Sequence, residues 1–246
     1  MAHGHAHRLQ PAAGYTKMPA AALPSLDMNF VSSQFPLWLL SLSWIAAVLL
    51  LIRAALRVPW FALSQSAITG WLGCTIAALT LWQMKASIQP GLSFHLIGAT
   101  ALTLIAGRDR ALLGLAAALA IDTGFGHAGW GAFGLSWLIT AALPCTLTQG
   151  LLGMAQRRLP LNYFIYIFLN AFAAAALSMW AVGLLTCGLL AAVGAYPLEF
   201  LLSEQLPYYF LMGWPEAFTT GSNMALLVIY RPQWVASFDD EKYLAD

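Results

Sequence analysis

Seven apolar runs follow one another along this chain, separated by six short segments, five of which contain charged residues. The runs cover residues 35–52, 67–84, 92–106, 111–125, 130–155, 163–196 and 208–230. A helix needs about 20 apolar residues to cross the roughly 30 Å hydrocarbon layer of a bilayer. Charged residues make up only 9% of the sequence and hydrophobic residues 60%, whereas soluble domains contain about 25% charged residues. The sequence therefore predicts an all-α, multi-pass membrane bundle of about seven transmembrane helices.

The runs differ in length, and the polar ends set the domain boundaries. Runs 92–106 and 111–125 are near or below the usual minimum of about 17 residues, so we expect tilted hairpin partners that line a cavity from one side. Run 163–196 is long enough to span and then follow the interface. We expect a polar, His-containing tail at 1–30, a transmembrane domain at 31–232 and an acidic, aromatic cytoplasmic tail at 233–246. That last tail either docks a partner or lies at the interface, held by Trp234 and Phe238.

Basic residues predict the orientation, because Lys and Arg near helix ends favour the cytoplasmic side. Eight follow alternate runs, and three lie on the other face. The first group is Arg53, Arg57, Arg108, Arg110, Arg157, Arg158, Arg231 and Lys242; the second is Arg8, Lys17 and Lys85. This alternation predicts an N-terminus outside, a cytoplasmic C-terminus and an odd number of spans.

Composition and missing motifs exclude several functions. A net charge of +1 gives no reason to expect a nucleic-acid partner. The sequence has no Gly-rich phosphate loop followed by Lys and Ser or Thr, and hence no nucleotide site. It also lacks a Gly-x-Ser-x-Gly elbow and a His-Glu-x-x-His helix. We therefore expect a protein that is not an enzyme.

The predicted topology gathers all five histidines on the outer side. His95 lies about one turn into the third run, and His127 lies in the turn after the fourth run, which Asp122 closes. His3, His5 and His7 belong to the N-terminal tail. Ionisable residues in membrane segments are rare and mark functional sites, and imidazole is the commonest ligand of transition metals. His95, His3, His5, His127 and Asp122 are the candidate metal ligands. Alternatively, His95 is a packing residue, or His95 and His127 are axial haem ligands.

The N-terminus offers a second source of nitrogen ligands. A free α-amine, the next amide nitrogens and His3 can surround Ni(II) or Cu(II) in a square plane. If Met1 is removed, His3 becomes the second residue and leaves a fourth position that His95 could fill. The alternative is that the His-containing start is an expression tag or a tail that binds nothing.

Several motifs resemble one transporter family. Residues 89–99, the turn 125–129 with 132–134, and residues 216–221 are similar to the CbiM/NikM-like substrate-binding membrane subunits of energy-coupling-factor ABC transporters, which take up cobalt or nickel. The C-terminal half, with residues 158–164 and 230–240, resembles a poorly characterised bacterial branch related to them. The resemblance covers roughly residues 29–244.

The resemblance implies a function, a site and partners. It implies a permease of the bacterial inner membrane that captures nickel or cobalt, with copper also allowed by the ligand chemistry. The site would lie near the outer surface and use the N-terminal amine, an early histidine and His95. The partners would be an ATPase and a transmembrane coupling subunit, within membrane lipid. Two features depart from the family: its Met-His-Ile-Pro-Asp-Gly start is absent, and Ser136 stands where an asparagine is expected. The alternative function is a non-transporting structural or assembly subunit of a larger membrane complex.

Overall fold

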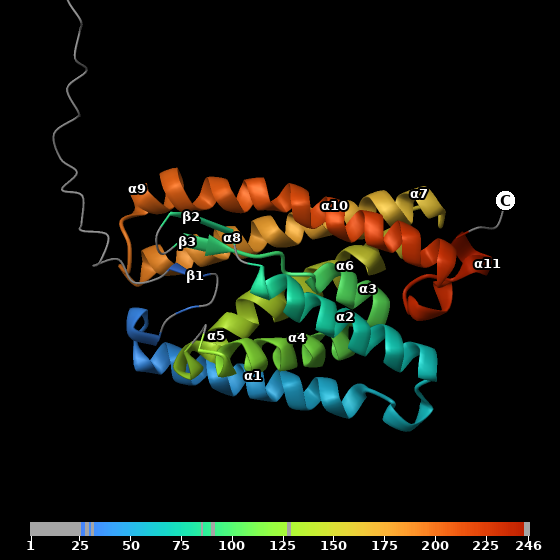
Figure 1. Ribbon diagram of the computed structural model, residues 1–246, viewed down its shortest axis with the longest axis horizontal. Helices are drawn as coiled ribbons and strands as arrows, with labels where there is room; N and C mark the ends of the chain where they lie inside the picture. Colours follow the sequence, from blue (N-terminus) through green and yellow to red (C-terminus); the bar gives the residue numbers. More distant parts are fainter. Residues whose placement is uncertain are drawn as a thin grey trace, which may run out of the picture.

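The protein folds into a bundle of helices that run along one long axis. The structure is a computed structural model that describes residues 26–27, 30, 32–84, 86–89, 92–126 and 129–243. Three short strands and α9 lie at one end of the bundle, called the sheet end, and α7 and α11 lie at the other, called the α11 end (Figure 1). Successive long helices run in alternating directions between these two ends.

The described chain contains eleven α-helices, three strands and short 3-10 helices at Ser32–Gln34, Trp60–Ala62, Trp130–Ala132 and Pro232–Trp234. The helices are α1 (Leu37–Arg57), α2 (Gln65–Gln83), α3 (Ala99–Ala106), α4 (Arg108–Gly124), α5 (Phe133–Trp137), α6 (Leu143–Arg158), α7 (Tyr163–Ile165), α8 (Ala174–Ala192), α9 (Leu198–Phe200), α10 (Leu206–Tyr230) and α11 (Asp240–Tyr243). The strands are β1 (Leu26–Asp27), β2 (Ala86–Gln89) and β3 (Leu92–Phe94). The stretches Leu138–Ala142, Tyr166–Ala173 and Leu201–Gln205 have π-helical turns and connect α5 to α6, α7 to α8 and α9 to α10.

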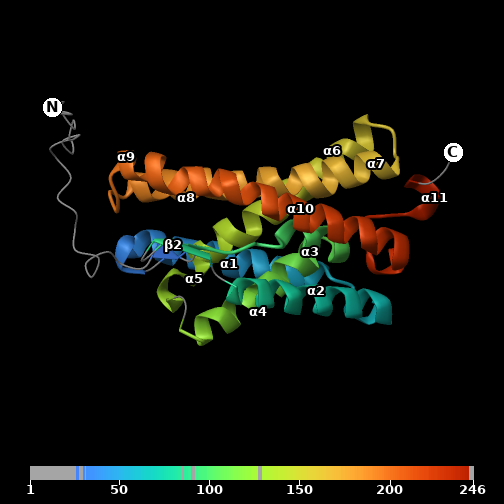
Figure 2. The ribbon, with the colours of Figure 1, turned by 45° about the horizontal axis from the view of Figure 1, so that its top comes forward.

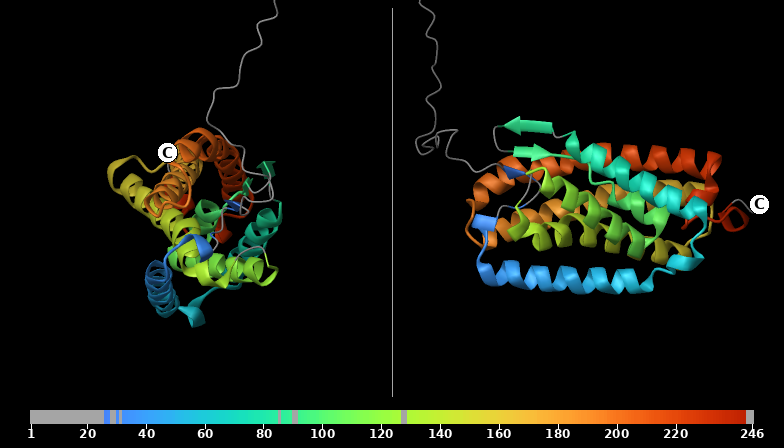
Figure 3. Two further views of the ribbon diagram at one scale, coloured as in Figure 1. Left: turned by 90° about the vertical axis from the view of Figure 1, so that its left-hand side faces the viewer. Right: turned by 60° about the horizontal axis from the view of Figure 1, so that its bottom comes forward.

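Helix length and hydropathy confirm a helical membrane protein. Among the described residues, Leu37–Arg57, Trp130–Arg158 and Tyr163–Ala192 are long and apolar enough to cross a bilayer, with mean hydropathies of 2.2, 1.4 and 1.9. α1 lies at the edge of the bundle (Figure 3), and only 22% of its apolar window is buried. Its exposed Leu and Ile side chains are therefore suited to face lipid. The total of seven spans and the orientation stay predictions.

The third apolar run is not the helix that the sequence predicts. Leu92–Phe94 forms β3, the next four residues have no regular secondary structure, and α3 begins only at Ala99. Gly98 has a φ of +69° at this boundary, a left-handed conformation that glycine adopts readily. With eight residues, α3 is about 12 Å long and cannot cross the bilayer alone. The prediction that His95 lies one turn into a helix is therefore wrong.

α3 is a short interior helix whose last carbonyls are bonded by the C-terminal segment. Every residue of α3 except Ala101 is buried. The backbone N–H groups of Ala236 and Ser237 donate to the carbonyls of Ile105 and Leu104, at 2.9 and 3.2 Å. Because the last carbonyls of a helix have no partner within it, this contact satisfies groups that would otherwise be buried without one. Residues 232–243 thus pack against the α11 end of the bundle.

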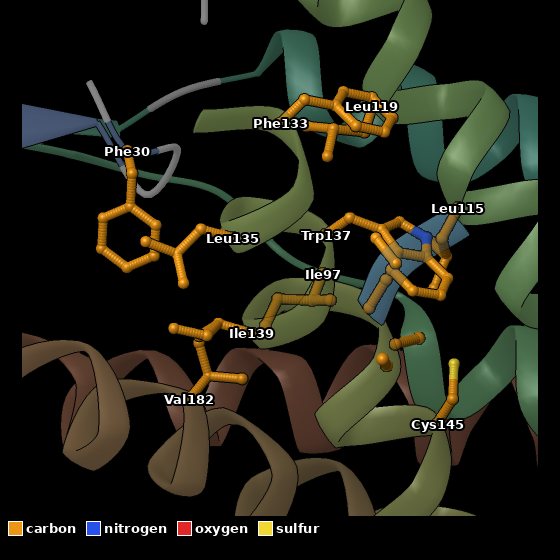
Figure 4. Close-up of a cluster of buried hydrophobic side chains, with 14 of the residues drawn as sticks. Phe30, Ile97, Leu115, Leu119, Phe133, Leu135, Trp137, Ile139, Cys145 and Val182 are labelled. Carbon is orange, nitrogen blue, oxygen red and sulfur yellow. The ribbon is translucent and has the colours of Figure 1, made fainter. Parts of the chain in front are cut away.

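The packed core fills the space between two groups of helices. α8 and α10 run side by side (Figure 2), and Gly183 of α8 lets the Tyr209 ring approach, since a Cβ there would lie 2.4 Å from it. Around α5, Trp137 is fully buried beside Leu115, and Phe30 lies near Leu135 (Figure 4). The Phe30 N–H donates to Ser136 Oγ at 3.0 Å. Ser136, which stands where the resemblance leads us to expect an asparagine, therefore binds the chain just before α1.

Candidate metal-binding site

His95 lies in the short irregular segment between β3 and α3, towards the sheet end. Its side chain is buried, with 2% of its surface exposed, and its Nδ1 lies 3.1 Å from the Leu96 carbonyl. A carbonyl oxygen only accepts, so this contact favours the tautomer in which Nδ1 has the hydrogen and Nε2 has the lone pair. Nε2 is then the nitrogen with which a neutral His95 can bind a metal ion.

Trp82 of α2 holds this segment from one side. Its ring centroid lies 5.0 Å from that of His95, at an angle of 39°. Its indole N–H donates to the Ile97 carbonyl at 3.1 Å, and the side chain is fully buried. Trp82 thus contacts the imidazole and also fixes the backbone two residues further on.

Glu216 of α10 holds the same segment at the start of α3. Its two carboxylate oxygens accept hydrogen bonds from the backbone N–H groups of Ile97 and Gly98, both at 2.8 Å. Glu216 is buried near the middle of the helical run 198–230. A carboxylate at a helix N-terminus satisfies free N–H groups and interacts favourably with the helix dipole. The pair of bonds therefore fixes the backbone two and three residues after His95.

The strands bring the N-terminal segment beside His95. β3 pairs in parallel with β1, with Leu26 opposite Leu92 and Asp27 opposite Ser93, and antiparallel with β2. Ser93 is two residues before His95. The pairing therefore places Asp27 of β1 opposite a residue that lies two positions before His95.

Asp122 is the second candidate ligand that the structure describes. It is fully buried near the end of α4, and its Oδ1 accepts a hydrogen bond from Gln83 Nε2 at 3.2 Å. Trp82 and Gln83 are consecutive, so the last turn of α2 contacts both His95 and Asp122. The structure thus places both predicted residues around one helix end.

The other predicted ligands lie beyond what the structure describes. His3, His5 and His127 are outside the described residues. Within the described ranges, no group of three or more His, Cys, Asp or Glu side chains is arranged to bind a metal ion. A complete site that includes His95 would therefore need ligands from the remaining parts of the chain.

Sequence reasoning missed the roles of Trp82 and Gln83. Neither forms a motif, and each acts through a contact that depends on the fold. A signal for Glu216 was present, because an acidic residue within an apolar run needs a partner. An apolar cavity of about 270 Å³ beside Glu216 is lined by α2, α3 and α10, but His95 is not among its lining residues. Leu96 and Gly98 do line it, so the cavity adjoins the segment that contains His95 without including the imidazole.

The fold and composition define a helical membrane protein in which a buried histidine lies close to a short interior helix. Residues 32–234 match the family described as the cobalt uptake substrate-specific transmembrane region. The chain belongs to this family and is a membrane component of metal uptake. The family is a transport family rather than an enzyme family.

A solved structure has the same fold. It is described as the crystal structure of a truncated transition metal transporter, and it aligns with a TM-score of 0.71 and 21% identity over 82% of this chain and 99% of the other. No curated protein sequence matches this chain.

Proposed function

We propose that this protein captures a divalent transition metal ion, nickel or cobalt, at an outward-facing site that includes His95. One observation supports the proposal most: the buried His95 follows a strand that pairs with the N-terminal segment. The tail residues His3 and His5 would supply further nitrogen ligands, with the N-terminal amine. His127 and Asp122 would complete or orient the site. Copper is the third candidate, because a square-planar nitrogen set suits it.

Capture would consist of an exchange of water ligands for nitrogen ligands. Imidazole binds a metal only in its neutral form, so we expect affinity to fall as the pH drops below about 6. The ion would then pass inward through a conformational change. We propose that an ATPase and a transmembrane coupling subunit drive this change, and that the protein is a multi-pass component of the bacterial inner membrane.

Metal titration of the purified protein tests the proposal. Nickel, cobalt and copper are titrated into the intact chain, into His95→Ala and into a form that lacks the residues before Leu9. We expect both changes to abolish stoichiometric binding. If only the truncation matters, the tail is an independent chelator and His95 a packing residue. No binding by any form, without a co-purifying ATPase, would favour the structural or assembly subunit.

A further inference from the structure

A cavity at the α11 end collects basic side chains from three parts of the fold. Its volume is about 440 Å³, and it lies between the α1–α2 connection, the junction of α3 with α4, and Ala236 of the C-terminal segment. Arg57 comes from the end of α1, and Arg108 and Arg110 come from the first turn of α4. Asp109 and Gln149 also line it. Three cations and one carboxylate make this cavity electropositive.

The three arginines have no carboxylate partner among the residues that the structure describes. Arg110 Nη1 makes one long hydrogen bond of 3.4 Å to the Ala67 carbonyl. Arg108 Nε is buried and makes no hydrogen bond. In the neighbouring cavity, the charge of Asp239 is already neutralised by Lys242, at 2.6 Å. An anion in the arginine-lined cavity would therefore supply the partner that the fold does not.

The backbone adds donors at the same place. Gly107, with a φ of +79°, precedes α4 and lines the cavity. The first N–H groups of a helix have no partner within it, and the helix dipole favours negative charge there. A guanidinium group can donate two parallel hydrogen bonds to two oxygens of one phosphate. Arginines around the start of a helix can therefore bind a phosphate group.

The surroundings favour a lipid as the source of that phosphate. Trp60 and Phe61 follow the cavity residue Arg57 in the α1–α2 connection, and both side chains are exposed. Trp is enriched at the level of lipid headgroups, and the exposed Phe61 adds apolar surface beside it. Ile52 and Leu56 continue the exposed apolar surface along α1. A phosphate in the cavity would thus have acyl-chain surface directly beside it.

We propose that this cavity binds the phosphate headgroup of an anionic phospholipid, with Arg57, Arg108 and Arg110 as its ligands. The acyl chains then lie along the exposed face of α1. Free phosphate has the same anionic chemistry but no acyl chain that could contact that apolar surface. The proposal does not depend on metal transport.

Native mass spectrometry of the full chain tests this site. Phosphatidylglycerol or phosphatidylcholine is added at equal concentration to the detergent-solubilised protein, and retained lipid is counted. The variants are Arg57→Gln, the double variant Arg57→Gln with Arg108→Gln, and the control Arg53→Gln. Arg53 is exposed one turn earlier on α1 and does not line the cavity. A third arm adds inorganic phosphate as competitor, and circular dichroism checks helix content.

We expect wild type to retain phosphatidylglycerol in preference to phosphatidylcholine. Each cavity arginine removed should weaken retention about fivefold, whereas Arg53→Gln should change it by less than about twofold. Because Arg57 is exposed, its single variant tests the site even if the double variant does not fold. Equal retention of both lipids, or equal losses in Arg57→Gln and Arg53→Gln, would overturn the proposal. Displacement of phosphatidylglycerol by equimolar inorganic phosphate would show a free-phosphate site instead.

Discussion

Glu216 accepts a hydrogen bond from the Gly98 N–H at 2.8 Å and so joins α10 to the start of α3. Its other oxygen accepts from the next N–H towards His95. The far end of α3 is bonded by Ala236 and Ser237, which follow α10 in the chain. Both ends of α3 are thus held by one C-terminal stretch. A shift of that stretch would displace both ends of α3, the helix that follows His95.

Replacement of Glu216 should destabilise the bundle in a graded way. Glu216→Gln leaves one of two buried N–H groups without an acceptor, and we expect a loss of about 1–3 kcal/mol in the free energy of unfolding. Glu216→Ala leaves both without one and should cost more. Thermal unfolding in detergent shows whether the stability falls in the order wild type, Glu216→Gln, Glu216→Ala. Glu199→Gln, an exposed change on α9, is the control and should have no effect. Equal stability of Glu216→Ala and wild type would show that these bonds do not hold α3.

Two Gly→Ala changes should shift the free energy of unfolding in opposite directions. Gly98→Ala places a Cβ on a residue with φ of +69°, which costs about 1–2 kcal/mol. The nearest side-chain atom would be 3.6 Å away, so the cost is conformational rather than steric. Gly188→Ala lies within α8 with nothing within 4 Å and should stabilise by up to about 1 kcal/mol. Shifts of the same sign in the unfolding midpoints would contradict this reading.

The C-terminal contact depends on a pair of hydroxyl groups. Ser237 Oγ lies 2.6 Å from Tyr166 OH and donates to the Leu104 carbonyl at 2.7 Å. We expect Ser237→Ala and Tyr166→Phe each to cost about 1–3 kcal/mol, because each leaves a partner unsatisfied. A double-mutant cycle should give a coupling of at least about 0.5 kcal/mol. Thr80→Ala, at an exposed hydroxyl on α2, is the control. Additive losses would show that the two hydroxyl groups act independently.

Low pH should destabilise α11 relative to its locally unfolded form. The Lys242 ammonium lowers the pKa of the Asp239 carboxyl through a hydrogen bond and its charge. A lowered pKa in the folded state means that the pair stabilises above the ordinary aspartate pKa and is lost as the pH falls through the lowered value. Hydrogen exchange at Lys242 and Tyr243, corrected for intrinsic rates, should therefore accelerate at low pH. Lys242→Gln should shift this change to higher pH. An unchanged pH profile in that variant would exclude the ion pair as the cause.

The long apolar runs predicted the helices well, because burial in lipid demands both length and continuity. The prediction failed for residues 92–98, where pairing with β1 depends on a segment more than sixty residues away. No local pattern contains that information. Glu216 shows the same limit: an acidic residue within an apolar run needs a partner, but its bond to Ile97 spans 119 residues. For the candidate site, the roles of His95 and Asp122 as metal ligands stay predictions, and the sequence pointed to neither of the α2 residues that contact them.

The Trp82 contact makes a final prediction about metal affinity. Trp82→Phe keeps a ring beside His95 but removes the hydrogen bond to the Ile97 carbonyl. Partners that orient a ligand typically change metal affinity by about 10–100-fold. Because Trp82 bonds the backbone rather than the imidazole itself, we expect a loss at the lower end, about tenfold, measured by competition with a chromogenic chelator. Trp38→Phe, an exposed change in the first turn of α1, should leave affinity unchanged. If both variants bind as tightly as wild type, the orientation of His95 does not depend on Trp82; if both are weakened equally, the loss reflects general destabilisation of the sheet end.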